Sequence, residues 1–248
     1  MASSQKGLNM IGLCDIHVHA IPSVDDGPGS LEIAIGILRD SYQGGVRHMI
    51  LTPHFRLGMF ETSDGKIKEN YEALKKEATS LFPDLELRLG CEFHANMEMA
   101  ELLTEHPRFF LAGSNYLLLE FSGQDNESYI RSRVQEAQSV GARVIIAHPE
   151  RYLAFRKRPD FADEIRRMGA LLQVNADAVL GKDGFGIKRF TTNLMKKGLV
   201  DFIASDAHDL KTRSTHLPEC ADAVANKYGA DIAEKIFIRN PEEILKDH

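Results

Sequence analysis

Short apolar runs alternate with helix-like segments along the chain, and this alternation limits the possible folds more than any other feature. The helix-like segments, such as 31–43, 66–81 and 128–140, repeat apolar residues every three or four positions. The runs between them are almost continuously apolar, as in parallel strands that are covered by helices. We predict seven strands, at 11–19, 46–52, 85–92, 115–121, 143–148, 170–175 and 200–206.

A succession of βα units of this length is typical of an α/β barrel. Barrels of this kind commonly need about 250 residues, and this chain has 248. No linker, low-complexity segment or long internal repeat divides the sequence. We therefore expect one α/β barrel domain over residues 1–248, in which residues 1–9 form a flexible N-terminal extension.

Composition excludes several classes of protein. The formal net charge of −6 gives no basic footprint for nucleic acid or for an anionic membrane surface. No run approaches the roughly 20 apolar residues of a membrane span, and the first residues lack the apolar stretch of a signal peptide. Three cysteines, odd in number and far apart, fit a reducing compartment better than a disulfide framework. We expect a soluble cytoplasmic protein without membrane insertion.

The first strand carries the motif Asp15-Ile-His17-Val-His19. Alternate positions on a strand point to the same side, and two imidazoles at a strand end can hold a divalent metal. Alone, this pair could equally be two surface histidines. In a parallel barrel, however, the C-terminal ends of all strands form one rim. Further acidic or imidazole groups follow the predicted strands at Asp26, His54, Glu92, Glu120, His148, Asp206 and His208.

These side chains indicate a metal site with more than one ion. Histidine and carboxylate ligands without thiolate suit Mn, Fe or Zn, and nine of them exceed what one ion can use. We therefore expect two or three ions, with a carboxylate such as Glu92 bridging two of them. A water between two ions becomes hydroxide near neutral pH and can attack phosphorus.

A phosphoryl group also needs positive charge that does not come from metal. Arg56, Arg151 and Arg213 each follow a proposed ligand in the loop after a strand. Guanidinium groups bind phosphate through a planar fork of N–H donors. We predict that at least one of the three contacts phosphate.

Other phosphatase and nucleotide chemistries find no support in the sequence. None of the three cysteines is followed by an arginine six positions later, as a thiol-phosphate mechanism requires. Motifs of P-loop, dinucleotide-binding and serine-hydrolase enzymes are absent from the sequence. Because Cys14 and Cys91 alternate with Asp15 and Glu92, we expect both thiols to face the helices and to be inert.

The motifs together resemble those of the PHP (polymerase and histidinol phosphatase) superfamily. Within it, the chain is similar over essentially its full length to the manganese-dependent bacterial protein-tyrosine phosphatases of capsular and exopolysaccharide synthesis. Asp25-Asp26-Gly27-Pro28 and the loop at 58–62 are specific to that branch. The other motifs that carry the resemblance are Asp15-Ile-His-Val-His19, His148-Pro-Glu-Arg151 and Ser205-Asp-Ala-His208.

The resemblance implies a distorted seven-stranded, TIM-like (βα) barrel with three metal ions, manganese in the first instance and iron or zinc otherwise. Because these ions leave no position for Asp15, we expect it to orient a neighbouring imidazole. By motif position, the first ion would be held by His17, His19, Glu92 and Asp206, the second by Glu92, Glu120 and His148, and the third by Asp26, His54 and His208. Arg56, Arg151 and Arg213 would bind the phosphate.

The resemblance further implies a substrate and a partner. The family removes phosphate from the tyrosine-phosphorylated tail of a bacterial tyrosine kinase. Separately from the resemblance, the exposed helices expected for this chain leave room for self-association. A small-molecule phosphatase, such as histidinol phosphatase, and a TatD-like metal-dependent nuclease remain alternatives. A PHP module that binds metal without catalysis is less favoured, because all nine ligand positions are filled.

Overall fold

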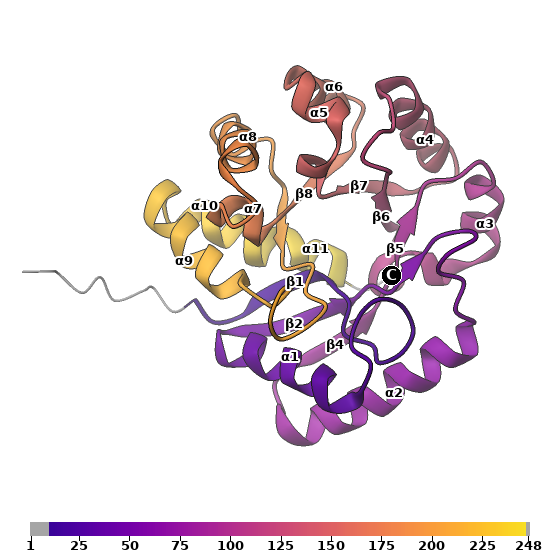
Figure 1. The fold of residues 1–248 in the computed structure, drawn as a ribbon, viewed down its shortest axis with the longest axis vertical. Coiled ribbons are helices and arrows are strands. Elements are labelled where there is room, and N and C mark those ends of the chain that lie inside the picture. Colours follow the sequence, from indigo (N-terminus) through magenta and orange to yellow (C-terminus); the bar gives the residue numbers. More distant parts are fainter. Residues whose placement is uncertain (1–9, 247–248) are drawn as a thin grey trace, which may run out of the picture.

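The structure, a computed structural model, describes residues 10–246, so the expected extension over residues 1–9 lies outside the described residues. Strands form the centre and helices surround them (Figure 1). The strands are β1 (Leu13–Val18), β2 (Val46–Leu51), β3 (His54–Phe55), β4 (Glu86–Leu89), β5 (Glu92–His94), β6 (Tyr116–Glu120), β7 (Arg143–Ala147), β8 (Leu171–Asn175) and β9 (Phe202–Ala204).

Helices follow the strands in regular alternation, and local signals fix their ends. The Ser30 side chain accepts a hydrogen bond from the Ile33 amide, and the Asn126 side chain accepts one from the Tyr129 amide, so each caps a helix N-terminus. The helices are α1 (Leu31–Gln43), α2 (Asp64–Leu81), α3 (Met99–Glu105), α4 (Glu127–Ser139), α5 (Leu153–Lys157), α6 (Asp160–Arg167), α7 (Ala176–Leu180), α8 (Phe185–Lys196), α9 (Leu217–Tyr228), α10 (Ala230–Glu234) and α11 (Asn240–Leu245). Shorter helical turns are η1 (Pro107–Phe109), η2 (Leu111–Gly113), η3 (Pro149–Arg151) and the π-helical η4 (Lys235–Arg239).

All paired strands are parallel, in the order β1-β2-β4 and β3-β5-β6-β7-β8-β9. The same sequence offset relates β2 to β4 and β3 to β5. The strand predicted at 46–52 therefore continues from β2 into β3 across a break at Thr52-Pro53. The strand predicted at 85–92 continues from β4 into β5 across a break at Gly90-Cys91. Pro53 has no amide to donate to a ladder, and a side chain at Gly90 would lie 2.8 Å from Leu111.

The barrel closes where β1 meets the end of β9. The His19 amide donates to the Ala207 carbonyl at 2.9 Å, and the Asp206 amide donates to the His17 carbonyl at 2.9 Å. Val18 and Ala207 form a parallel bridge. The expected α/β barrel is confirmed, and its closure lies at the C-terminal rim.

A bulge in β1 changes which residues face the barrel interior. Between Asp15 and Val18 the register against β2 shifts by one residue. Below the bulge, Cys14 and Ile16 pack inside the barrel, while His17 and His19 face the interior above it. The prediction that Cys14 faces the helices, and that Asp15 shares a face with both histidines, was wrong for this reason.

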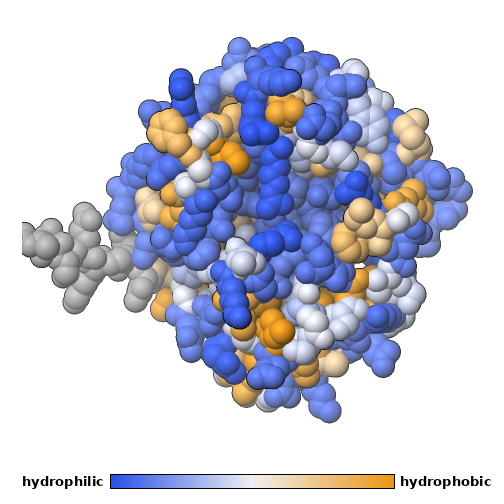
Figure 2. Space-filling model, viewed as in Figure 1, coloured by the Kyte–Doolittle hydropathy of each residue, from blue (hydrophilic) through white to orange (hydrophobic). Residues whose placement is uncertain are grey.

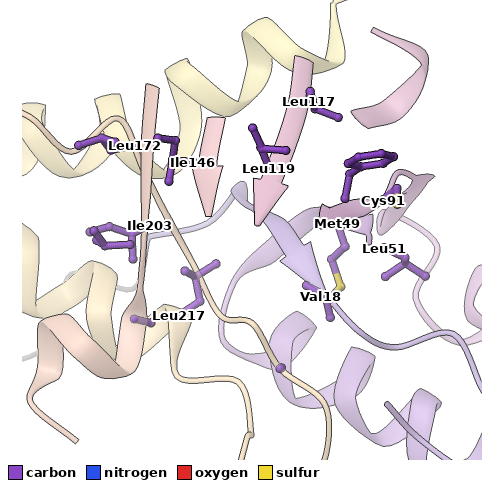
Figure 3. Close-up of a cluster of buried hydrophobic side chains, with 14 of the residues drawn as sticks. Val18, Met49, Leu51, Cys91, Leu117, Leu119, Ile146, Leu172, Ile203 and Leu217 are labelled. Carbon is purple, nitrogen blue, oxygen red and sulfur yellow. The ribbon is translucent and has the colours of Figure 1, made fainter. Parts of the chain in front are cut away.

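Two hydrophobic clusters support the rim. The larger cluster lies between the outer faces of the strands and the helices, where Figure 3 labels Met49, Leu119 and Ile146 among others. Cys91 belongs to this cluster, as predicted. The smaller cluster fills the barrel below the rim and includes Leu118 and Ile145. None of the helices described in residues 10–246 is both long and apolar enough to cross a membrane.

Candidate metal centre

The nine side chains predicted as ligands converge at the C-terminal rim. The strands β3, β5 and β6 supply His54, Glu92 and Glu120, and the loops after β1, β7 and β9 supply most of the others. Figure 2 shows that this face of the molecule is mainly hydrophilic near its centre. Ligand atoms lie within 4.8 Å of one another in four groups: His17, His19 and Glu92; His17, His148 and Asp206; His54, Glu92 and Glu120; and His19, Asp26, His54 and His208.

Glu92 lies at the centre of these groups. One of its carboxylate oxygens is 3.2 Å from Nε2 of His17, 3.2 Å from Nε2 of His19 and 2.9 Å from Nδ1 of His54. The other oxygen is 2.7 Å from Nε2 of His148. A single buried carboxylate thus contacts four imidazoles, which is the arrangement expected of a ligand shared between two ions.

Asp206 and Asp26 extend the centre on either side. Asp206 Oδ1 is 3.5 Å from Nε2 of His17 and 3.6 Å from Nε2 of His19. Asp26 Oδ1 is 3.2 Å from Nε2 of His208 and 3.5 Å from Nε2 of His54. The outer group, which contains Asp26, is more open to solvent than the group around Asp206. The Asp26 side chain is 42% exposed, whereas that of Asp206 is 2% exposed.

The second nitrogen of three histidines is held by the protein. Nδ1 of His17 donates to Gln173 Oε1 at 2.9 Å, and Nδ1 of His19 donates to Asp25 at 2.8 Å. Nδ1 of His208 donates to the Asp206 carbonyl at 2.9 Å. Each acceptor keeps the proton on Nδ1 and leaves the Nε2 lone pair facing the centre, as metal-binding histidines require.

The chemistry of this donor set fits divalent cations. Nε2 of His17 and Nε2 of His19 lie 3.1 Å apart, so two lone pairs meet in a buried space. Within residues 10–246, His54 Nδ1, Glu92 Oε2 and His208 Nε2 have no hydrogen-bond partner although they are buried. Buried polar atoms are normally paired, and cations held by the ligand groups to which these residues belong would satisfy them. Nitrogen and oxygen donors suit Mn, Fe or Zn, and the identity of the ion stays a prediction.

Two of the candidate ligands have strained backbones. His148 has φ 31° and Asp206 has φ 54°, both in the left-handed region that residues with a side chain seldom adopt. His148 directly follows β7, and Asp206 lies two residues after the end of β9. Such strain persists where the surrounding structure enforces it, typically at functional sites.

Asp15 does not have the role that was predicted for it. Its Oδ1 accepts hydrogen bonds from the Ser205 amide at 3.0 Å and the His17 amide at 3.4 Å. The carboxylate therefore fastens β1 to the end of β9 through the backbone, and the prediction that it orients an imidazole was wrong.

Burial and neighbouring charges shift the acid–base behaviour of the centre. Burial and then the Arg151 charge lower the pKa of His148 to about 4. Burial and then the neighbouring His19 lower the pKa of His208 to about 4. Burial and then the Glu92 charge raise the pKa of Glu120 to about 9. At neutral pH both histidines are therefore neutral, the form that binds metal.

The three predicted arginines all lie at this rim. Arg151 donates to Asp206 Oδ2 at 2.8 Å. Arg213 spans two carboxylates, at 3.0 Å from Asp26 and 3.3 Å from Asp206. Arg56 lies in the loop after β3, where its backbone pairs with Phe60, and its charge acts on Glu120. Their role in binding phosphate stays a prediction.

Sequence reasoning missed several residues that support the centre. Gln173 and Asn175 face the interior from β8, and Tyr152 contacts Nδ1 of His148 at 3.1 Å. Asn175 donates to Asp206 Oδ2 at 2.9 Å. A polar residue inside an apolar strand, such as Gln173 between Leu172 and Val174, was the available signal.

We predict that Mn²⁺ raises the melting temperature of the wild-type protein and that Glu92→Gln removes most of this increase. Binding to the native state alone adds about 2.7 kcal/mol at a ligand concentration of about 100 Kd. Differential scanning calorimetry with and without Mn²⁺ measures the effect, with Glu77→Gln on the exposed side of α2 as the control. An equal increase in Glu92→Gln and wild type would contradict the assignment of Glu92.

Three comparisons with known proteins indicate the same family. The family model described as capsular polysaccharide synthesis, CpsB/CapC, matches residues 13–246. The tyrosine-protein phosphatase CpsB of Streptococcus pneumoniae is 34% identical over 240 residues, covering 95% of this chain and 99% of the relative. The tyrosine-protein phosphatase YwqE of Bacillus subtilis is 28% identical over 235 residues, covering 95% of this chain and 92% of the relative.

Solved structures extend the likeness to three dimensions. A chain from the crystal structures of YwqE and CpsB, described as unique metal-dependent tyrosine phosphatases, superposes with a TM-score of 0.86 at 28% identity. The match covers 94% of both chains. An organophosphorus hydrolase from Deinococcus radiodurans superposes with a TM-score of 0.58 at 14% identity, over 95% of this chain and 92% of the hydrolase, which shows a shared barrel fold alone.

Proposed function

The chain belongs to the CpsB/CapC family of capsular polysaccharide synthesis proteins, and from this premise we propose that it is a metal-dependent phosphatase that hydrolyses phosphotyrosine in proteins. The observation that carries the proposal is the contact of Glu92 with four imidazoles directly beneath a rim that holds three arginines. A cluster of cation ligands and a set of phosphate-binding groups at one rim is what hydrolysis of a phosphate monoester requires.

We assign two or three Mn²⁺ ions to the centre. The innermost ion would be held by His17, His19, Glu92 and Asp206, the next by Glu92, Glu120 and His148, and the outer one by Asp26, His54 and His208. The bound metal would supply acidified water near neutral pH and positive charge to polarise the phosphoryl oxygens. Gln173 and Asp25 keep the imidazoles of His17 and His19 in the required tautomer.

The arginines bind and orient the phosphoryl group. Arg151 and Arg213 approach Asp206 from two sides, and each exposes roughly two fifths of its side chain, at 43% and 36%. Their free N–H groups therefore remain available to an incoming anion. A phenolate leaving group, with a reference pKa of about 10, needs less protonation than an alkoxide does. The site suits a tyrosine phosphate for this reason.

Other phosphatase classes fit less well. Cys14, Cys91 and Cys220 are all buried, and burial raises the pKa of each thiol, so none is placed to attack phosphorus. A TatD-like nuclease does not need the outer group formed by Asp26, His54 and His208, and the net charge of −6 disfavours nucleic acid. A small-molecule phosphatase with the same centre remains the rival.

The proposed physiological substrate is the phosphotyrosine tail of a bacterial tyrosine kinase in capsule or exopolysaccharide synthesis. Relatives of this chain are named tyrosine-protein phosphatases, and the family model is described by capsular polysaccharide synthesis. Self-association of the protein is a further part of this proposal.

We predict that the purified protein with Mn²⁺ hydrolyses p-nitrophenyl phosphate and phosphotyrosine peptides, and that a chelator abolishes both activities. Addition of Mn²⁺ after removal of the chelator should restore turnover. Iodoacetamide should leave it largely intact, because all three thiols are buried. Activity that survives complete metal removal would contradict the proposal, and a strong preference for histidinol phosphate would favour the rival.

Replacing Arg151 with Ala should lower kcat/KM for a phosphotyrosine peptide by roughly 10- to 100-fold, mainly through a higher KM. A hydrogen bond to a charged group contributes about 1.5–3 kcal/mol, which corresponds to that range. Steady-state kinetics measure the change, with metal content checked in parallel and Arg39→Ala on α1 as the control. A loss confined to kcat would instead place Arg151 in stabilisation of the transition state.

A further inference from the structure

A groove beside α8 has a charge that sets it apart from the rest of this acidic protein. It has a volume of about 710 Å³ and is lined by Arg156, Lys188, Arg189 and Lys196, together with Phe185. None of the residues that line it is acidic. In a chain with a net charge of −6, four cations around one groove form a local positive field.

Most of these cations are free to bind a ligand. Within residues 10–246, Arg156, Arg189 and Lys196 form no ion pair, whereas the Lys188 ammonium donates to the Leu180 carbonyl at 2.9 Å. The carboxylates of the neighbouring helix α6 are paired with other cations.

Two sets of ion pairs involve these carboxylates. The ammonium of Lys197 lies 3.1 Å from Asp160 and 2.8 Å from Asp163. Arg158 pairs with Glu164. The positive charge of the groove is therefore not neutralised by α6.

The lining residues of α8 form one stripe along the helix. Phe185, Arg189 and Lys196, with Thr192 between the last two, recur at intervals of three or four residues. At 1.5 Å per residue the stripe is about 16 Å long, which equals roughly five residues of extended chain. Phe185 is 82% exposed at its start, where an apolar contact is available.

The groove begins beside the phosphate-binding rim. The turn η3 carries Arg151 and packs against α8, and α5 with Arg156 follows η3 directly. Figure 1 shows α5, α6 and α8 next to one another beyond the ends of β7 and β8. A polypeptide whose phosphotyrosine reaches Arg151 can therefore continue along α8 without leaving the protein surface.

We propose that this groove binds acidic residues that flank the phosphotyrosine of the substrate polypeptide. The inference rests on the proposed function and adds a preference for acidic sequence to it. Charge complementarity identifies the occupant, and the length of the stripe exceeds that of a small phosphate ester. A nucleic acid would also be anionic, but the net charge of −6 disfavours it.

The test is a binding measurement that does not depend on turnover. Two fluorescent peptides each carry one phosphotyrosine, with three glutamates on either side in the first and three glutamines on either side in the second. Fluorescence anisotropy with the full chain should show that the acidic peptide binds about tenfold more tightly at low salt. This preference should shrink in about 0.5 M NaCl, because salt screens exposed charges.

The double variant Arg189→Glu, Lys196→Glu should remove the preference for the acidic peptide. The matched control, Arg39→Glu, Lys76→Glu, makes the same change of charge on α1 and α2 and should keep it. Both variants should hydrolyse p-nitrophenyl phosphate at the wild-type kcat/KM and unfold at the wild-type temperature.

Three results would overturn the proposal: equal binding of both peptides by the wild type, an equal loss of preference in both double variants, or tighter binding of a short single-stranded DNA through Arg189 and Lys196. A wild-type protein that prefers the acidic peptide but hydrolyses no phosphotyrosine would support the groove and contradict the proposed function, so the two failures are distinguishable.

Discussion

The candidate metal centre depends on imidazole lone pairs that meet at one buried carboxylate. Nε2 of His17 and Nε2 of His19 lie 3.1 Å apart, and Glu92 reaches both at 3.2 Å. Because Gln173 and Asp25 hold the protons of these rings on their outer nitrogens, a cation is the natural partner of the inner ones. The bulge in β1 and the left-handed backbone at His148 and Asp206 bring the side chains to this point.

The sequence was sufficient to predict the convergence of the ligands, because parallel strands end at one rim whatever their details. It was not sufficient to predict local departures from regular geometry. One extra residue in β1 turned Cys14 inward and moved Asp15 off the histidine face, and periodicity alone cannot show a bulge. The roles of Gln173 and Asn175 depend on contacts across the barrel, which local sequence does not encode.

Charge is distributed so that an acidic protein can attract an anionic substrate. Carboxylates at the centre contact imidazoles, and Arg151 and Arg213, which pair with Asp206 and Asp26, keep part of their side chains exposed. The groove along α8 extends this positive region away from the site, with Arg189 and Lys196 unpaired within residues 10–246. In our account the centre determines the reaction, and the surrounding cations determine which phosphorylated polypeptide reaches it.

We propose that the residues around Glu92 hold metal ions. Anomalous diffraction at the manganese absorption edge, from crystals grown with Mn²⁺, would show such ions. We predict anomalous peaks between Glu92 and the imidazoles of His17, His19 and His148, with a further peak among Asp26, His54 and His208 when the outer group is filled. A map without a peak in contact with Glu92, or with peaks only at other places on the protein, would contradict it.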